Sequence, residues 1–170
     1  PYNGVWRFYG MAADLADVPP AGDVPDGVEV VELTHDDSHI WLELVSWRYG
    51  LGQESSQYLI EAYRRAVGDR TRGWVALVDG EPVSKAVLHI DHHANPRGVA
   101  GIYGVATTES GRNRGLARLL CSTALDAARA AGVERTVLHS TPMARSLYQR
   151  MGYEDVATFE VWAAPDTVHL

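Results

Sequence analysis

The chain has 170 residues, 46% hydrophobic and 22% charged, which is typical of one folded domain with a single core. Its formal net charge of −7 argues against a nucleic-acid partner, because phosphates require a basic surface. No run of about 18 apolar residues is present for a membrane-spanning helix, so we expect no membrane association.

Single residues add three constraints. Cys121 is the one cysteine, which excludes an intrachain disulfide and favours a reducing, cytoplasmic compartment. Lys85 is the one lysine beside fourteen arginines. The chain opens on Pro1 rather than methionine, so we expect a processed or truncated chain, or a piece of a longer product.

Residues 1–27 differ from the rest and are predicted to be an N-terminal extension and linker, open to interpretation as the remnant of an upstream segment. Tyr2–Phe8 is apolar and could form a strand that pairs with such a segment. Residues 18–27 are dense in Pro, Gly and Asp, as linkers are. The folded domain is expected at 28–170.

From Val28 the pattern becomes regular. Alternation predicts a strand over 28–33, and apolar stripes predict helices over 36–50 and 53–67. The aromatic residues of those helices are expected to lie mostly in the core, with one or two lining a pocket: Trp41, Trp47, Tyr58 and Tyr63. Asp79-Gly80 between apolar runs predicts a hairpin of strands 74–78 and 82–91.

The second half alternates strands and helices. We expect a turn at 96–98, a strand over 99–107, a helix over 114–131 that ends at Gly132, and a strand over 133–140. Thr141 as N-cap and Pro142 at N1 predict a further helix up to Gly152, followed by a strand over 153–163.

The turn between strand 99–107 and helix 114–131 carries the strongest functional signal. Unpaired N–H groups at the helix start, two arginines (Arg112 and Arg114) and two glycines (Gly111 and Gly115) converge there, as a pyrophosphate requires. An incidental surface cap is the alternative. The spacing fits neither a Gly-x-x-x-x-Gly-Lys-Ser/Thr loop nor a Gly-x-Gly-x-x-Gly dinucleotide turn.

Two motifs in this order resemble a known family. Arg112-x-x-Gly115-x-Ala117, after a strand containing Val105, is similar to the Arg/Gln-x-x-Gly-x-Gly/Ala signature of the GNAT superfamily of acyl-CoA-dependent N-acyltransferases. Leu147-Tyr148-Gln-Arg-Met-Gly152-Tyr153 resembles that family's Leu-Tyr-x-x-x-Gly-Phe/Tyr segment. The resemblance covers residues 28–163 and implies an α/β (α+β) fold, with a mixed, mostly antiparallel central sheet flanked by helices.

The resemblance also implies the site. Acetyl-CoA would lie between strand 99–107 and strand 133–140, which separate, and the backbone of Val105 and Thr107 would pair with its pantetheine arm. The N–H groups of Arg112, Asn113, Arg114, Gly115, Leu116 and Ala117 would hold the pyrophosphate. Tyr148 would lie by the thioester sulfur as general acid, because a phenol with a pKa near 10 stays protonated at neutral pH.

This chain departs from the family pattern at two places. The common Val-x-Pro is Val105-Ala-Thr107 here, and the arginine follows the valine by seven residues instead of five. The longer loop leaves open which N–H groups contact phosphate. Thr141 replaces a common asparagine before the last helix, which leaves that residue's cofactor contact open.

The base is not assigned by the sequence. His139 is one candidate, because its pKa range is suitable and it lies near the predicted separation of the strands. A water chain is the alternative, and Glu109 is expected to cap the helix or face solvent. His89, Asp91 and His93 suggest a metal site, but they end a hairpin strand far from the loop, so solvated turn residues are expected and no metal is predicted.

The sequence thus favours transfer of acetyl from acetyl-CoA to a primary amine by direct attack in a ternary complex. The acceptor would be a small molecule or peptide, and a homodimer is left open. The alternative is a non-catalytic acyl-CoA-binding or sensor domain of a larger protein. An unrelated nucleotide-binding domain is a more distant option.

Overall fold

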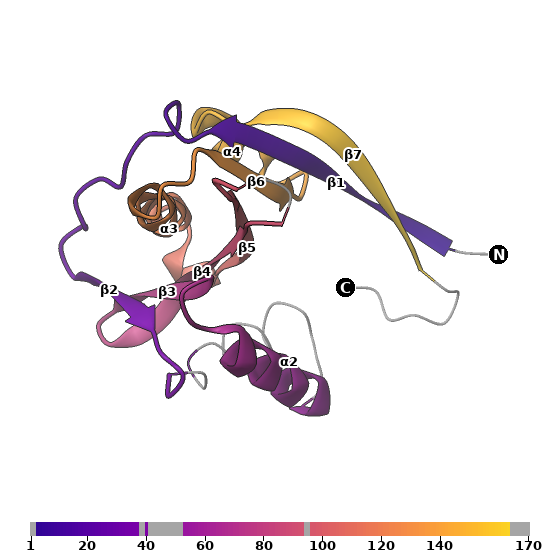
Figure 1. Ribbon diagram of the computed structural model, residues 1–170. Helices are drawn as coiled ribbons and strands as arrows, with labels where there is room; N and C mark the ends of the chain where they lie inside the picture. The colour runs from indigo at the N-terminus through magenta and orange to yellow at the C-terminus, as the bar shows by residue number, and fades with distance from the viewer. Residues whose placement is uncertain (1–2, 38–39, 41–52, 94–95, 164–170) are drawn as a thin grey trace.

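A computed structural model describes residues 3–37, 40, 53–93 and 96–163 (Figure 1). Its helices are α2 (Gln53–Ala66), the 3-10 turn η1 (Glu109–Gly111), α3 (Leu116–Ala130) and α4 (Arg145–Arg150). Its strands are β1 (Asn3–Asp14), β2 (Val28–Leu33), β3 (Thr71–Val78), β4 (Glu81–Asp91), β5 (Val99–Thr107), β6 (Arg135–Ser140) and β7 (Glu154–Ala163).

Within the described residues the strands form one seven-stranded sheet in the order β2-β3-β4-β5-β6-β1-β7. The β5–β6 pair is parallel, and the other neighbouring strands are antiparallel. Helices lie on both sides of the sheet, with α3 on one side and α2 on the other (Figure 1). The expected class, a mixed, mostly antiparallel sheet flanked by helices, is confirmed.

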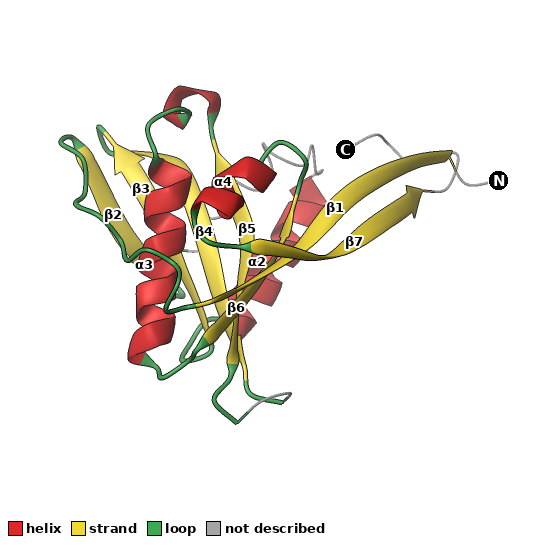
Figure 2. Cartoon of the chain, turned by 90° about the horizontal axis from the view of Figure 1, so that it is seen from above, coloured by secondary structure: helices red, strands yellow, loops and turns green. Residues whose placement is uncertain are grey.

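The main core lies between the sheet and α3, the long helix that crosses the sheet in Figure 2. The buried residues of α3 recur at helical spacing and form one apolar face. They pack against the apolar residues that β3, β4, β5 and β6 direct to this side, such as Trp74, Leu88, Ile102 and Leu138. The α3 members of this core are Leu116, Leu120, Cys121, Ala124, Leu125 and Ala128.

Turn chemistry fixes the two ends of this core. Asp79 and Gly80 have φ values of 53° and 83°, which is the conformation of a tight hairpin turn between β3 and β4. Gly132 follows α3 with a φ of 80°, and the N–H of Val133 donates to the carbonyl of Ala128. The hairpin and the glycine stop of α3 therefore form as the sequence predicts.

The N-terminal strand is part of this sheet. β1 pairs with β6 over Tyr9–Asp14 and with β7 over Asn3–Ala12, so both of these partners are later strands of the same sheet. Residues 15–27 then lead to β2, and the guanidinium of Arg129 donates to the carbonyl oxygens of Leu15 and Val18. Residues 9–12 of β1 thus have strand partners on both edges, whereas residues 3–8 pair with β7 on one edge, and pairing of this segment with an upstream one stays a prediction.

Three further expectations concern the helices. The helix expected over 36–50 falls largely outside the described residues, and Trp41 and Trp47 lie there. In α2, Tyr63 is buried, but Tyr58 is 76% exposed and is therefore not a core residue. The last helix is shorter than predicted: Thr141 and Pro142 form a turn in which the Thr141 hydroxyl accepts the N–H of Ala144, before α4 begins.

Candidate active site

The separation of β5 and β6 is the feature that the family resemblance led us to expect. The two strands pair only at three positions, the last of which joins Ile102 to Leu138. β5 then continues to Thr107 along β4, while β6 continues to Ser140 along β1. The strands therefore part after Ile102, and the β5 edge from Tyr103 onward lies beyond its last pair with β6.

A bulge in β5 marks the same point. Lys85 opposes Ala106 and Val87 opposes Tyr103, so β5 has one more residue than β4 between these two pairs. Gly104 has a φ of 56°, which is the left-handed conformation that a bulge of this type requires. A bulge leaves a residue of the ladder without a partner, and Gly104 and Val105 are the two residues of β5 that lie between the flanking pairs.

The loop after β5 runs from Thr108 to Gly115 and is fastened to β4. The N–H of Thr108 donates to the Val83 carbonyl at 2.8 Å. A Cβ on Gly111 would lie 3.0 Å from the Val83 Cβ and carbonyl oxygen. The lack of a side chain at Gly111 thus leaves room for the protein's own β4, and not for a ligand as the sequence suggested.

Gly115 behaves differently. Its φ is 76°, and a Cβ there would meet nothing within 4 Å, so open space lies in front of it. The N–H of Leu119 donates to the Gly115 carbonyl, which makes Gly115 the N-cap of α3. The N–H groups of Leu116, Ala117 and Arg118 precede this first helical bond and carry the positive end of the helix dipole.

The three residues before Gly115 complete the loop. Asn113 has a φ of 60°, and left-handed residues close together turn successive N–H groups to one side, a concavity that suits anions. Arg112 and Arg114 are exposed beside it. The structure therefore brings together six predicted contacts on one loop, from Arg112 to Ala117, with Val105 and Thr107 at the end of the preceding strand.

Tyr148 lies on α4 and is 5% exposed. Its ring packs edge-on against Tyr153 with centroids 6.0 Å apart. Burial raises the pKa of the Cys121 thiol on α3 to about 12, and the Tyr148 side chain opposes that rise. Tyr148 is thus a core residue on the α3 side of the sheet, with its polar end directed at α3.

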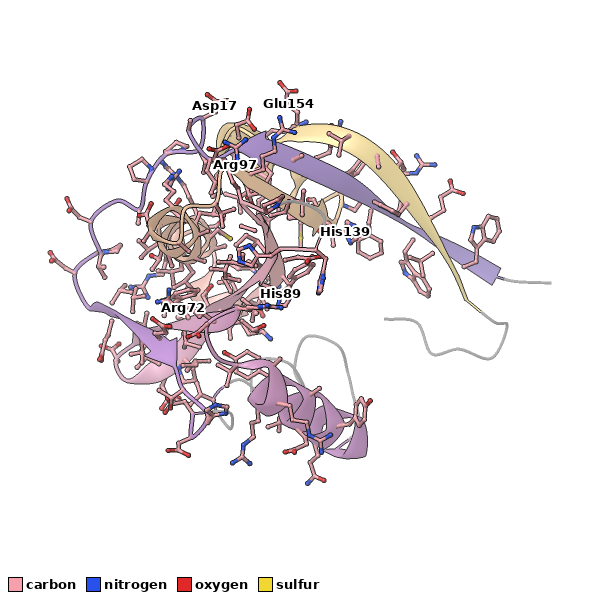
Figure 3. All side chains as sticks on the ribbon, in the orientation of Figure 1. Asp17, Arg72, His89, Arg97, His139 and Glu154 are labelled. Carbon is pink, nitrogen blue, oxygen red and sulfur yellow. The ribbon has the colours of Figure 1, made fainter. Side chains whose placement is uncertain are left out.

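His139 lies on the opposite side of β6. Leu138 is part of the core against α3, and strand alternation directs the next side chain to the other side. Figure 3 shows His139 beneath the curved β1–β7 pair, on the side that faces α2. Its ring lies 4.6 Å from that of Phe159, centroid to centroid. The two candidate groups, Tyr148 and His139, therefore flank β6 from different sides.

Lys85 was not singled out as a site residue by the sequence. It is fully buried on β4, beside the bulge of β5, and desolvation lowers the pKa of its amine to about 7. Its strand neighbours Val75 and Ala106 place it on the α2 side of the sheet. The sequence signal that could have identified this buried amine is a lone lysine within the mostly apolar segment 82–90.

His89 and Asp91 lie at the end of β4, and His93 follows them. The His89 ring pairs with the hydroxyl of Thr71 at 2.8 Å, and the N–H of His93 donates to the Asp91 carboxylate. Across the described ranges, His, Cys, Asp and Glu side chains form no group of three that could hold a metal ion. Glu109 is exposed in η1. None of the helices described is long and apolar enough to cross a bilayer.

Comparison with known proteins agrees with this architecture. Residues 37–153 match the Acetyltransferase (GNAT) family, so the chain belongs to that family. A mycothiol acetyltransferase of Beutenbergia cavernae is 29% identical over 179 residues, which span 95% of this chain and 59% of that protein. The chain thus covers less than two thirds of that relative's length.

Solved structures share the fold. An acetyltransferase of the GNAT family from Novosphingobium aromaticivorans superposes with a TM-score of 0.66 at 22% identity, over 95% of this chain and 65% of that one. AAC(6')-Iy, solved in complex with the bisubstrate analog CoA-S-monomethyl-acetylneamine, gives a TM-score of 0.66 at 17% identity, over 76% and 92%. These likenesses establish the fold.

Proposed function

We propose that this domain transfers an acetyl group from acetyl-CoA to a primary amine of a small molecule or peptide. The observation that carries the proposal is the parting of β5 and β6 beside a left-handed loop at the start of α3. Family membership and the open space before Gly115 support it. A cytoplasmic location, consistent with the single buried cysteine, is part of the proposal.

Main-chain groups would hold the coenzyme. The N–H groups from Arg112 to Ala117 would hold the diphosphate at the positive end of α3. The backbone of Val105 and Thr107 would pair with the pantetheine arm in the place that β6 vacates. The bulge at Gly104 would direct a backbone N–H to the thioester carbonyl, as an oxyanion hole does.

The chemistry needs two proton transfers. The amine nitrogen attacks the thioester carbon, a C–N bond forms, and the C–S bond breaks with its electron pair going to sulfur. His139, or water beside it, would take the proton that the amine loses, and Tyr148 would supply a proton to the thiolate. Positions on two sides of β6 suit these roles, since acceptor and leaving group occupy different sides of the reacting carbon.

Thiol release tests the proposal. We expect free CoA thiol to appear when the protein is mixed with acetyl-CoA and a panel of primary amines, with one acetylamide formed for each thiol. Thiol release without acetylamide would indicate hydrolysis and contradict the proposal. The absence of both, together with no coenzyme binding, would remove the assignment.

A non-catalytic acyl-CoA sensor is the second candidate, and the position of Tyr148 favours it. Its side chain is 5% exposed and packs against Tyr153 in the core instead of lying at an exposed surface. A sensor would be stabilised thermally by CoA without turning over any amine. Stabilisation accompanied by amide formation would exclude the sensor.

A further inference from the structure

The outer part of the β1–β7 pair extends beyond the rest of the sheet. β6 reaches β1 only as far as Tyr9, so residues 3–8 of β1 pair with β7 alone (Figures 1 and 2). Two strands by themselves are marginally stable in water. This ribbon bends over the side of the sheet that carries α2 (Figure 1).

Register divides the ribbon's side chains into two faces. Trp6 opposes Val161, Phe8 opposes Phe159 and Gly10 opposes Ala157. Residues that oppose each other, or lie two apart, share a face. We call the face formed by Trp6, Phe8, Phe159 and Val161 the inner face. Arg7 and Glu160, which form an ion pair at 3.3 Å, belong to the outer face.

Phe159 connects the inner face to the candidate active site. A Cβ on Gly10 would lie 2.7 Å from the Phe159 ring, so this glycine leaves room for the ring to lie close to β1. The same ring contacts His139 at 4.6 Å. The inner face therefore begins at His139 and runs outward along the ribbon without a break.

The inner face is apolar and accessible. Phe159 and Val161 are 44% and 43% exposed, and Trp6 and Phe8 are half-buried. Over residues 6–10 and 157–161, every side chain on this face is uncharged, while the charged pair lies on the other face. Tyr103, itself 46% exposed, lies where β5 leaves β6.

From this arrangement we infer that the inner face binds the acceptor, and that the acceptor is an amine carried on a flat apolar skeleton, as in an arylalkylamine. The inference rests on the proposed function. An aromatic skeleton would stack on Phe8, Phe159 and Trp6 and cover the apolar area that water now contacts. Its amine would then lie at the end of the inner face that is formed by His139, next to the candidate active site.

Ring faces also suit the charge of the acceptor before reaction. An ammonium group is attracted to the face of an aromatic ring, and this attraction holds without a carboxylate. A carboxylate close to the reacting nitrogen would keep its proton bound and oppose attack. An aromatic wall that ends at an imidazole therefore recognises the amine while allowing it to lose its proton.

Amine competition tests the inference. With saturating acetyl-CoA, we expect kcat/KM for phenethylamine to exceed that for butylamine and glucosamine by at least about tenfold, the effect of covering one ring. Phe8→Ala and Phe159→Leu should each raise KM for phenethylamine and leave KM for butylamine and the Kd of CoA nearly unchanged. A merely structural role would alter all three.

A matched control lies on the same strand. Trp162 is 57% exposed and alternates to the outer face, so Trp162→Ala removes a large exposed aromatic residue without touching the inner face. It should leave the preference for phenethylamine intact. Thermal unfolding of each variant identifies loss of fold, and Phe8→Leu replaces Phe8→Ala if the latter unfolds.

The outcomes separate this inference from the proposed function. Acetylation of all three amines at equal efficiency, or a preference for glucosamine, overturns the inference and leaves acetyl transfer standing. No acetylation of any amine removes both. The inner face could instead be covered by a second copy of the chain, which analytical sedimentation tests. A dimer that Phe159→Leu converts to monomer would overturn the inference. The same sedimentation coefficient for Phe159→Leu and the parent protein supports it.

Discussion

The two sides of the central sheet differ in how they are built. The α3 side is closed, apolar and formed largely by neighbouring segments, with Leu116, Leu120 and Leu125 against β4 and β5. The α2 side combines groups from distant parts of the chain, such as Lys85, His139 and Phe159. In our proposal, the α3 side supplies a fixed frame for the coenzyme, and the α2 side is where the acceptor is recognised.

The largest expected effect comes from the start of α3. Gly115→Asp places a carboxylate in the open space before the helix, where the diphosphate would lie. Because like charges repel and the dipole is neutralised, the Kd of CoA should rise by at least about 100-fold in calorimetric titration.

Gly132→Asp is the matched control for that change. Gly132 has a φ of 80° and nothing within 4 Å of a Cβ, so the backbone strain is the same at the opposite end of the helix. Its CoA affinity should equal that of the parent. Equal loss in both variants would indicate helix strain as the cause.

Tyr148→Phe tests the α3 side as a source of the proton. We expect kcat to fall by about 100-fold, the usual contribution of a general acid, with little change in the Kd of CoA. Tyr153→Phe is the control, because Tyr153 is also buried and its hydroxyl bonds Thr136 at 2.8 Å. It should lower stability and spare kcat. Undiminished turnover in Tyr148→Phe would assign its hydroxyl to packing against Cys121.

Lys85 predicts how stability depends on pH. Its pKa is lowered from 10.5 to about 7 in the fold, so between these values the unfolded chain binds more protons than the native one. The free energy of unfolding should therefore rise as pH increases from 7 to 9. In urea titrations, Lys85→Met should flatten this rise, and a slope that survives the substitution would assign it to other groups.

The smallest effect is expected at Gly111. A Cβ there would press on Val83 and shift the loop by a few tenths of an ångström. Gly111→Ala should weaken CoA binding about threefold, which corresponds to less than 1 kcal/mol. Gly22→Ala, where a Cβ meets nothing within 4 Å, should leave binding unchanged. A 100-fold loss for Gly111→Ala would mean that the loop contacts the coenzyme through Gly111 itself.

Most of the fold could be predicted from local sequence patterns. The bounds of β2 follow from strand alternation, and those of β5 from the turn before it and the glycine-bearing loop after it. The Asp79-Gly80 turn and the Gly132 stop follow from residues that tolerate positive φ. Partners far apart in sequence could not be deduced in this way. Nothing in the residues of β1 identifies β6 and β7 as its neighbours, so its place in the sheet could not be predicted.

The site was predictable to the same extent. The loop Arg112–Ala117 is contiguous, so its motif was visible, whereas Lys85 and Phe159 approach the site only through strand register. Gly104 inside an apolar strand was an available sign of a bulge that went unused. Tyr58 shows the limit of periodicity, because a helical stripe does not reveal whether another element covers it.

An amide-resolved NMR titration with CoA tests the central assignment most directly. We predict that the largest shifts occur at the N–H groups from Arg112 to Ala117, followed by those from Gly104 to Thr107, and that they saturate together. Amides of this loop that remain unmoved at millimolar CoA, or shifts confined to another surface, would contradict the account.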